Sequence, residues 1–212
     1  MTLKRKKIGI IDYAQGNTQS VINSLIKLEV DFVHCKKEDD LDDCSHIILP
    51  GVGSFVRVMQ SLKELKLIEK LNHEILNNKK FFLGICVGFQ ILFDFGLEQK
   101  KTKGLGWIKG YCGKFSFKEK NIILPHIGWN HVELNNKIDI LNGIENYRDN
   151  LFYFVHSFRV NKIDEDTTIY SESFYHENFI SVLKKENIYG VQFHPEKSQI
   201  NGLKLLENFC NL

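Results

Sequence analysis

A cysteine flanked by glycines carries the sharpest chemical signal in the chain. In the segment Gly84–Gly88 (GICVG), Cys86 lies two residues from each glycine, after a predicted buried strand and before a predicted helix. A nucleophile in such a tight turn, with glycines where a Cβ would clash, is typical of a nucleophile elbow. The adjoining helix N-terminus favours the reactive thiolate. We therefore predict that Cys86 is a nucleophile; a buried structural cysteine between packing glycines is the alternative.

A candidate base and its orienting group lie together near the C-terminus. His194, Pro195 and Glu196 follow a predicted strand over residues 189–193. In an extended chain, side chains two residues apart point the same way, so the imidazole and the carboxylate can hydrogen-bond. A thiol nucleophile needs such a base, and the base needs such a group. The pattern predicts a Cys86–His194–Glu196 triad, with a chance H-P-E among eight histidines as the alternative.

A glycine-containing loop, Pro50–Gly53 (PGVG), follows another predicted strand, residues 46–49. Its backbone N–H groups are candidates for part of an oxyanion hole, although Pro-Gly after a strand is also ordinary turn chemistry. The G-x-x-x-x-G-K spacing of a phosphate-binding loop is missing. His126 and His131 have no third ligand at a fixed spacing. We therefore predict no metal and no cofactor.

The elements that must position these residues alternate first and then become mostly strands. Strands are predicted at 7–13, 30–35, 46–49 and 80–85, and helices at 18–29, 55–76 and 87–95. The later predicted strands are 107–117, 121–124, 130–134, 151–155, 167–174, 179–183 and 189–193, before a helix at 202–210. This order predicts an α/β fold with a mainly parallel central sheet flanked by helices and an additional antiparallel layer. Ligands of such sheets bind at the carboxyl ends of the strands.

Composition excludes several classes of protein. The 212 residues are enough for one domain spanning 1–212. Twenty-eight basic and 26 acidic residues leave a charge of +2, so neither nucleic acid nor a membrane surface is indicated as a partner. No apolar run reaches the roughly 18 residues of a membrane span. Five cysteines without C-x-x-C spacing predict a reduced, cytoplasmic protein rather than a disulfide framework.

The three chemical segments together resemble class I (triad) glutamine amidotransferases, which have a flavodoxin-like fold. The resemblance narrows to the family of amidotransferase subunits of imidazole glycerol phosphate synthase, the HisH family, and it covers residues 7–211. The segments that carry it are DYAQGN at 12–17, PGVGSF at 50–55, PHIGWN at 125–130, YFVHS at 153–157 and GVQFHPEKSQ at 190–199.

The resemblance implies a glutaminase mechanism. Cys86 would attack the side-chain amide of L-glutamine and form a glutamyl thioester. His194 would take the thiol proton and pass one to the departing ammonia, while Glu196 orients the imidazole. The ammonia would pass to a partner in a heterodimer, a (β/α)₈-barrel cyclase. That subunit makes imidazole glycerol phosphate and an aminoimidazole carboxamide ribonucleotide in histidine biosynthesis.

The resemblance also implies which residues surround the triad. The residues implied to bind glutamine or its oxyanion are Gly51, Gly53, Val87, Gln90, His156, Ser157 and Phe158. Those implied to face the partner are Trp129, Tyr153 and Lys197. Each has a plainer alternative. Gln90 would be a solvated helix residue, Trp129 a core aromatic, and Lys197 an exposed member of a surface charge pair.

Departures from the family pattern motivate a second hypothesis. Ala14, Thr18 and Phe89 replace residues that are usual in the family. The alternative is a paralogous glutaminase subunit that delivers ammonia to a different synthetase, such as a sugar-amidating enzyme. A cysteine α/β-hydrolase fits less well, because its acid normally precedes the histidine and Glu196 follows it. A non-catalytic binding subunit would require a vestigial triad, and all three members are present.

Overall fold

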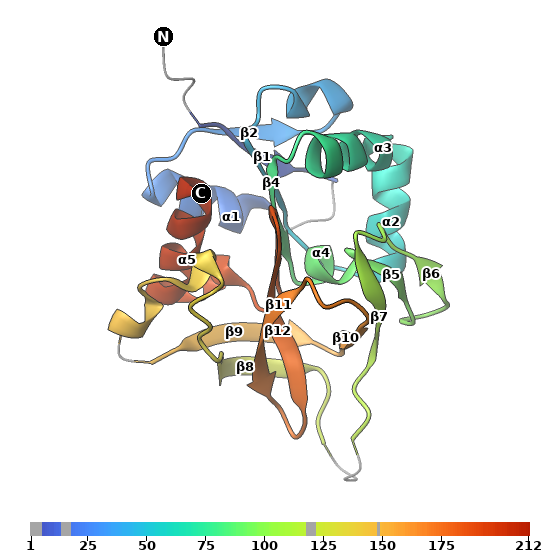
Figure 1. Ribbon diagram of the computed structural model, residues 1–212, viewed down its shortest axis with the longest axis vertical. Helices are drawn as coiled ribbons and strands as arrows, with labels where there is room; N and C mark the ends of the chain where they lie inside the picture. Colours follow the sequence, from blue (N-terminus) through green and yellow to red (C-terminus); the bar gives the residue numbers. More distant parts are fainter. Residues whose placement is uncertain (1–5, 14–17, 118–121, 148) are drawn as a thin grey trace.

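A seven-stranded sheet forms the centre of the molecule, with the strand order β11-β12-β13-β4-β3-β1-β2 (Figure 1). The structure is a computed structural model that describes residues 6–13, 18–117, 122–147 and 149–212. The strands are β1 (Ile8–Ile11), β2 (Phe32–Cys35), β3 (His46–Leu49), β4 (Phe81–Ile85), β11 (Ile169–Phe174), β12 (Asn178–Lys185) and β13 (Ile188–Val191).

Five of these strands run parallel, and this brings the predicted chemical segments to one edge. The parallel neighbours are β2, β1, β3, β4 and β13, whereas β12 pairs antiparallel with both β13 and β11. Because β3, β4 and β13 are adjacent, their carboxyl ends lie side by side. Pro50, Cys86 and Gln192 are the residues that directly follow these three ends. The prediction of a mainly parallel sheet is confirmed.

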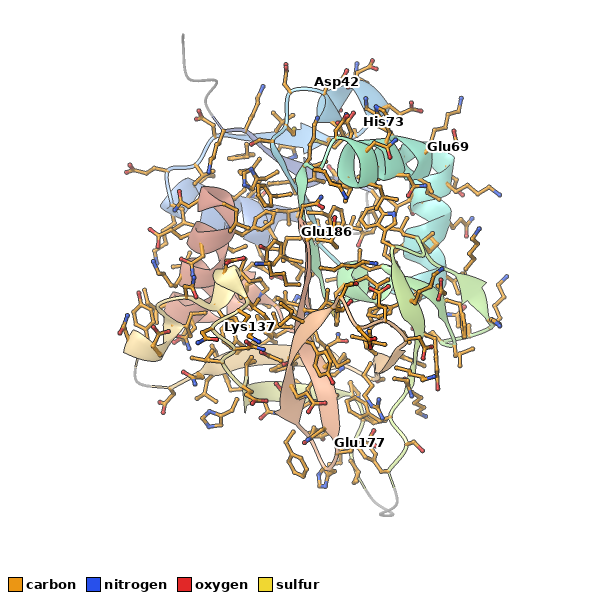
Figure 2. All side chains as sticks on the ribbon, viewed as in Figure 1. Asp42, Glu69, His73, Lys137, Glu177 and Glu186 are labelled. Carbon is orange, nitrogen blue, oxygen red and sulfur yellow. The ribbon has the colours of Figure 1, made fainter. Side chains whose placement is uncertain are left out.

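Helices cover both faces of the sheet (Figure 1). On one face lie α1 (Thr18–Lys27) and α5 (Gln199–Asn211). On the other lie α2 (Phe55–Glu64), α3 (Leu67–Asn72), a single π-helical turn η2 (His73–Asn77) and α4 (Val87–Gln90). Polar side chains such as Glu69 and His73 project from the outer side of this second layer (Figure 2). Within the described residues, no helix is long and apolar enough to cross a bilayer.

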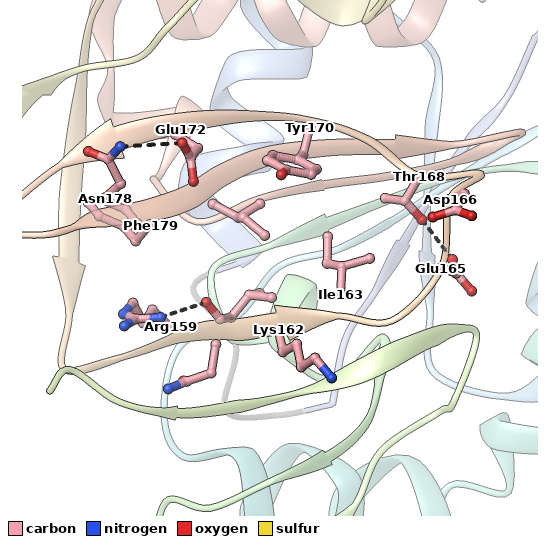
Figure 3. A pocket seen from close by; sticks show the side chains of 13 residues that line it. Arg159, Lys162, Ile163, Glu165, Asp166, Thr168, Tyr170, Glu172, Asn178 and Phe179 are labelled. Atoms are coloured by element: carbon pink, nitrogen blue, oxygen red, sulfur yellow. Dashed lines mark hydrogen bonds between the residues drawn. The ribbon is translucent and has the colours of Figure 1, made fainter.

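Two smaller sheets complete the fold. One has the order β10-β7-β5-β6, from β5 (Phe93–Gly96), β6 (Thr102–Lys103), β7 (Ile108–Lys114) and β10 (Phe158–Ile163). The other pairs β8 (His126–His131) with β9 (Leu151–His156). A cavity of about 530 Å³ lies between β10 and the β11–β12 pair, with Arg159, Glu165 and Glu172 on its walls (Figure 3). None of the residues lining this cavity belongs to the predicted site.

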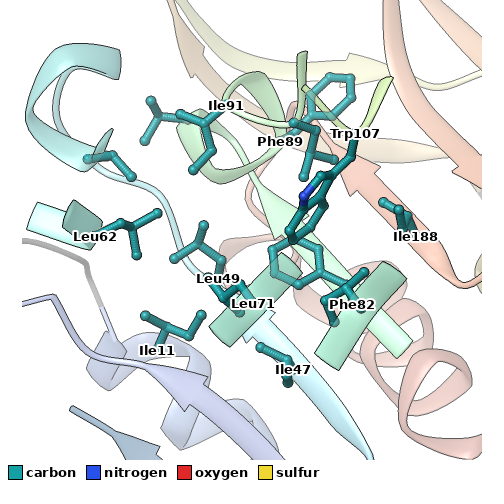
Figure 4. Close-up of a cluster of buried hydrophobic side chains, with 14 of the residues drawn as sticks. Ile11, Ile47, Leu49, Leu62, Leu71, Phe82, Phe89, Ile91, Trp107 and Ile188 are labelled. Carbon is teal, nitrogen blue, oxygen red and sulfur yellow. The ribbon is translucent and has the colours of Figure 1, made fainter. Parts of the chain in front are cut away.

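The apolar strands fill a core on each face of the central sheet. Ile11, Leu49 and Phe82 pack toward α2 and α3, together with Trp107 (Figure 4). Their neighbours along the strands, among them Leu83, pack toward α1 and α5. Successive side chains of a strand point to opposite faces, so a strand covered on both sides must be apolar throughout. This explains why the parallel strands read as continuous hydrophobic runs.

Two predicted helices are shorter in the structure. The helix predicted over 55–76 is divided, because Lys66 adopts a left-handed backbone (φ 57) between α2 and α3. The helix predicted over 87–95 ends after one turn at Gln90, because Phe93–Gly96 forms β5 and pairs with β7 and β6. The pairing of β5 is a contact with distant segments, which hydrophobic periodicity cannot detect.

Two of the strand predictions also differ. The described part of the predicted strand 121–124, residues 122–124, is not a strand, and residue 121 lies outside the described residues. The strand predicted over 130–134 begins earlier, at His126, and ends at His131. Strand β10 was not predicted at all. In β8 the apolar Ile127 and Trp129 are exposed and His126 is buried, so the usual pattern of apolar residues inside and polar residues outside is inverted.

Candidate active site

Cys86 occupies a strained turn between β4 and α4. Its backbone angles are φ 53 and ψ −110, in a region that residues with a Cβ rarely adopt. Such a conformation costs about 1–3 kcal/mol and persists only where the surroundings impose it. The thiol is 8% exposed. The turn has the strand–nucleophile–helix order of a nucleophile elbow.

Three glycines allow the backbone around this turn to interlock. A Cβ on Gly84 would lie 2.4 Å from the Gly88 carbonyl oxygen, and one on Gly88 would lie 2.3 Å from the Leu49 carbonyl oxygen. A Cβ on Gly51 would lie 2.3 Å from the Gly88 amide nitrogen. Backbone atoms at these separations leave no room for a side chain. The elbow and the loop after β3 are therefore packed as one unit.

His194 and Glu196 are joined by a buried hydrogen bond. Nδ1 of His194 lies 2.8 Å from Oε1 of Glu196, and both side chains are 2% exposed. The sequence analysis expected extended chain here, but Pro195 instead begins a 3₁₀ turn, η5 (Pro195–Lys197). Proline suits this position because its φ is fixed and its missing N–H is not needed there. The turn carries the carboxylate back to the imidazole.

The charge state of His194 follows from its surroundings. Burial alone would lower the pKa of this histidine, but the electrostatic effect of the nearby Cys86, together with Glu196, raises the pKa to about 10. Nε2 of His194 makes no hydrogen bond of ordinary geometry with any residue in the described part of the chain. The other nitrogen is held by Glu196. An imidazolium facing a thiolate is the arrangement of an activated cysteine nucleophile.

Two buried glutamines lie beside the sulfur. Nε2 of Gln192 is 3.7 Å from Sγ of Cys86, and Oε1 of Gln192 accepts a hydrogen bond from Nε2 of Gln90 at 3.0 Å. Gln90 also donates to the carbonyl oxygen of Phe158 at 2.8 Å. Gln90 is therefore a buried residue, and the solvated-helix alternative is wrong. Sequence reasoning missed Gln192; its signal was an amide in an otherwise apolar strand end just before His194.

A cavity of about 210 Å³ opens at Cys86. Six residues that the sequence analysis assigned to glutamine binding line it, and these are Gly53, Val87, Gln90, His156, Ser157 and Phe158. Gly51 does not line it, because it packs behind the elbow. Glu98, Pro125 and Val155 line the cavity without having been predicted. Oε2 of Glu98 accepts a hydrogen bond from the amide of Phe55 at 2.7 Å, which fixes this carboxylate at the start of α2.

The three residues predicted to face a partner form one cluster. Trp129 is 45% exposed, so the core alternative for this residue is wrong. Its ring centroid lies 6.0 Å from that of Tyr153, and Nζ of Lys197 lies 6.0 Å from the Tyr153 ring centroid. Trp129 also borders a cavity of about 300 Å³ shared with the exposed Ile200. A solvent-facing cluster of aromatic rings and a lysine is typical of an interaction surface.

Among residues 6–13, 18–117, 122–147 and 149–212, no three or more His, Cys, Asp or Glu side chains are arranged to hold a metal ion. The segment 12–17, one of those that carry the family resemblance, lies partly outside the described residues, including Ala14.

Comparison with known proteins shows the family to which this chain belongs. The family model "Glutamine amidotransferase class-I" matches residues 9–211. "Imidazole glycerol phosphate synthase subunit HisH 1" of Campylobacter jejuni (strain RM1221) is 43% identical over 206 residues, which are 97% of this chain and 100% of that protein. The HisH subunits of Pelagibacter ubique and Methanocaldococcus jannaschii are 42% and 44% identical, each over 97% of this chain and 99% of its own length.

Solved structures show the same fold at low sequence identity. The structure titled "Structure of PurLQS from Thermotoga maritima" has a TM-score of 0.75 at 22% identity and covers 98% of both chains. One titled "Crystal structure of glutamine amidotransferase" has a TM-score of 0.74 at 13% identity, over 97% of this chain and 99% of that one. These likenesses confirm the predicted fold class.

Proposed function

This chain belongs to the class I glutamine amidotransferases and, within them, to the HisH subunits of imidazole glycerol phosphate synthase, and from that membership we propose how its residues release ammonia. The subunit is the glutaminase of that enzyme in histidine biosynthesis. The family match is unfavourable to the cysteine hydrolase alternative. Identities of 42–44% to three HisH subunits also give no support to a sugar-amidating paralogue.

We propose Cys86 as the nucleophile. Its thiolate attacks the side-chain amide carbon of glutamine and forms a C–S bond, and the carbonyl oxygen becomes an oxyanion. His194 gives its Nε2 proton to the amide nitrogen, the C–N bond breaks, and ammonia leaves a glutamyl thioester. A water molecule, deprotonated by His194, then attacks the thioester. The C–S bond then breaks, glutamic acid leaves and gives its carboxyl proton to solvent, and the imidazolium of His194 again faces the thiolate of Cys86.

The buried carboxylate of Glu196 supports both steps. Its hydrogen bond to Nδ1 holds the imidazole of His194 with Nε2 directed away, and its charge stabilises the imidazolium. The oxyanion would be held by the backbone N–H of Val87, which begins α4, with a second donor from the Gly51–Gly53 loop. The close packing of Gly51 against Gly88 supports this, because it fixes the loop beside the elbow.

The cavity beside Cys86 suits glutamine in size and in chemistry. The side chains of Gln90 and Ser157 offer polar groups for the substrate, and Phe158 lines the cavity beside them. His156 lines the same wall, and its pKa is lowered by burial to about 3, so the ring is neutral there. The carboxylate of Glu98 complements an α-ammonium group, since it is fixed on the wall of the cavity by the Phe55 amide.

We propose that the partner is a (β/α)₈-barrel cyclase, bound as a heterodimer through the cluster of Trp129, Tyr153 and Lys197. Ammonia released at Cys86 would pass into that subunit and react there to give imidazole glycerol phosphate and the aminoimidazole carboxamide ribonucleotide. The exposure of Trp129 supports this surface. A cytoplasmic location is also proposed, since all five cysteines are free thiols.

One observation carries the glutaminase mechanism. The imidazole of His194 and the carboxylate of Glu196 form a buried hydrogen bond, and Glu196 and the nearby Cys86, in its strained turn, raise the pKa of that imidazole. The test is Cys86→Ser in the complex with the cyclase. We expect glutamine-dependent turnover to fall by at least about 10³-fold, in line with loss of a nucleophile, while turnover with free ammonia persists. Unchanged glutamine hydrolysis in this variant would exclude the mechanism.

The partner is tested separately by mixing the chain with the histidine-pathway cyclase. Complex formation on size exclusion and faster glutamine hydrolysis are expected. Trp129→Ala should weaken the complex by about 2 kcal/mol or more, as for a central interface aromatic, and the exposed Tyr170→Ala on β11 serves as the matched control. No binding by the unaltered chain would exclude the cyclase as partner.

A further inference from the structure

A continuous line of hydrogen bonds crosses from β8 to the active-site cavity. Nδ1 of His126 lies 3.0 Å from Nε2 of His156, and Nδ1 of His156 lies 2.9 Å from the carbonyl oxygen of Phe158. At the other end, Nδ2 of Asn130 lies 3.4 Å from Nε2 of His126. His126 and His156 are 3% and 5% exposed. Neither histidine belongs to the triad; His156 lines the cavity, and the mechanism above gives His126 no role.

The direction of these bonds is fixed from both ends. The Phe158 carbonyl can only accept, so Nδ1 of His156 must carry a proton. A neutral His156 then has a bare Nε2, and Nδ1 of His126 must donate to it. The Asn130 amide is fixed independently, because Nδ2 donates to the Phe174 carbonyl at 2.8 Å and Oδ1 accepts from the His131 amide at 2.8 Å. Nδ2 thus faces Nε2 of His126 as a donor.

Burial and stacking keep both rings neutral and in place. Desolvation lowers the pKa of His126 to about 4 and, as the largest effect, that of His156 to about 3. The His126 ring stacks on Tyr175 with a centroid distance of 4.0 Å and on Phe154 at 5.0 Å. Only one arrangement of protons therefore satisfies the whole line, from Asn130 through the two histidines to Phe158.

The same Phe158 carbonyl oxygen holds the glutamine side chains beside the nucleophile. It accepts from Gln90 at 2.8 Å as well as from His156. Gln90 in turn donates to Gln192, whose Nε2 lies 3.7 Å from the sulfur of Cys86. A carbonyl oxygen has two lone pairs, and here both are used. The position of His156 thereby sets the position of Gln90 on the cavity wall.

The outer face of the same two strands carries the exposed aromatic cluster. In the β8–β9 ladder, His126 pairs with His156, and Trp129 pairs with Tyr153 (strands labelled in Figure 1). Side chains alternate across a strand, so His126 and Asn130 point inward while Trp129 points outward. Anything that shifts Trp129 against Tyr153 also shifts the line of hydrogen bonds on the inner face.

We propose that His126 is a positioning residue for glutamine binding, and that the His126–His156 pair, each protonated at Nδ1 only, links the outer face of β8–β9 to Gln90 in the cavity. This rests on the proposed function, because the cavity is taken as the glutamine site. The pair acts through position and donates no proton to the substrate.

The first test reads the tautomers without any activity. Long-range ¹H–¹⁵N spectra of the ¹⁵N-histidine-labelled full chain at pH 7, assigned with His126→Phe and His156→Phe, report which ring nitrogens carry protons. We expect Nδ1–H and a bare Nε2 on both. A proton on Nε2 of either histidine, or a charged ring, would overturn the proposal. This result stands whether or not Cys86 is the nucleophile, which Cys86→Ser tests separately.

The second test is kinetic. His126→Phe keeps a ring between Tyr175 and Phe154 but cannot donate, and we expect the KM for glutamine to rise by up to about tenfold with a smaller change in kcat. His126→Asn places a donor where Nδ1 was, and should recover much of the loss. The matched control is His73→Phe, at an exposed histidine on the outer layer. An unchanged KM in folded His126→Phe, or no recovery in His126→Asn, would refute the role.

Discussion

The α-carbon of Gly88 faces the carbonyl group of Leu49 so closely that a Cβ at position 88 would lie 2.3 Å from the carbonyl oxygen. Gly88 is the second residue of α4, just after Cys86 and Val87, and Leu49 ends β3, beside the loop proposed for the oxyanion. The first turn of α4 and the end of β3 can therefore pack this closely only because residue 88 has no side chain.

Gly88→Ala should therefore lower the free energy of unfolding by about 1–3 kcal/mol, as overpacking does, although alanine is the better helix former. Glutamine hydrolysis should fall as well, because the elbow and the loop separate. Urea denaturation and a glutaminase assay measure the two effects. Gly113→Ala in β7 is the matched control, since its nearest contact is the Asn161 side chain at 3.0 Å, which can move. Equal losses in both variants would contradict the steric argument.

The cysteines should differ sharply in reactivity. Only Cys86 borders the cavity, and it faces the charged imidazole of His194. Burial raises the pKa of Cys112 well above its usual range and that of Cys210 to about 12. Iodoacetamide on the native protein, followed by mass spectrometry, should modify one thiol quickly. Loss of that fast phase in Cys86→Ser identifies it; rapid labelling of Cys112 or Cys210 would count against the predicted order.

Glu196→Gln should weaken the base. Burial lowers the pKa of His194, whereas Cys86 and Glu196 raise it, so removing the carboxylate charge must lower that pKa. Less imidazolium then faces the sulfur at neutral pH. We expect kcat to fall on the order of 10²-fold, and Cys86 alkylation to slow at pH 7. Glu186→Gln, in an exposed pair with Lys79, serves as the control. If Cys86 in Glu196→Gln were alkylated at the wild-type rate, the carboxylate would not control the charge of His194.

The protein should lose stability in mild acid. Burial lowers the pKa of His46 and His126 to about 4 and that of His156 to about 3. Below about pH 6.5 the unfolded chain binds a proton at each histidine and the native chain does not, so stability falls as pH falls from about 6.5 to about 4. Each group contributes up to about 1.4 kcal/mol per pH unit. The raised pKa of His194 changes the stability only above pH 6.5, so it does not contribute to the loss of stability between pH 6.5 and 4.

His46→Phe isolates one of these groups. The His46 ring stacks on Phe81 at 4.9 Å and meets Phe209 edge-on at 5.3 Å, so a phenyl ring keeps these contacts although it loses the hydrogen bond between Nδ1 and the Ser45 hydroxyl. We expect the slope of unfolding free energy against pH to decrease by about one proton between pH 6.5 and 4. Urea denaturation at several pH values measures it. His73→Phe should keep the wild-type slope, and an unaltered slope in His46→Phe would refute the assignment.

Local patterns were enough to propose the triad, which stays a prediction. The elbow needs only five consecutive residues around Cys86, and His194 and Glu196 are two residues apart, so the chemistry is encoded within short segments. The strands β1, β3 and β4 were also predictable, because a strand covered on both faces must be continuously apolar. The steric need for Gly84 and Gly88 follows from the same local turn.

Residues whose partners lie far along the chain could not be found this way. Gln192 meets Gln90 across 102 positions, and His126 meets His156 across 30, so neither pair has a fixed spacing to recognise. Glu98 reaches the cavity because it accepts from the Phe55 amide, 43 positions away. These contacts exist only once the sheets and helices are packed.

The sequence by itself was enough to propose which residues do the chemistry, since a nucleophile, its base and the orienting acid are specified by side-chain type and by turns a few residues long. Only the tertiary structure decided which other residues lie around the proposed catalytic side chains. The early end of α4 at Gln90 depends on the pairing of β5 with β7, and the inward position of the His126 ring depends on its contact with His156. Hydrogen bonds and close packing are short-range in space but not along the chain, so only the folded molecule could show them.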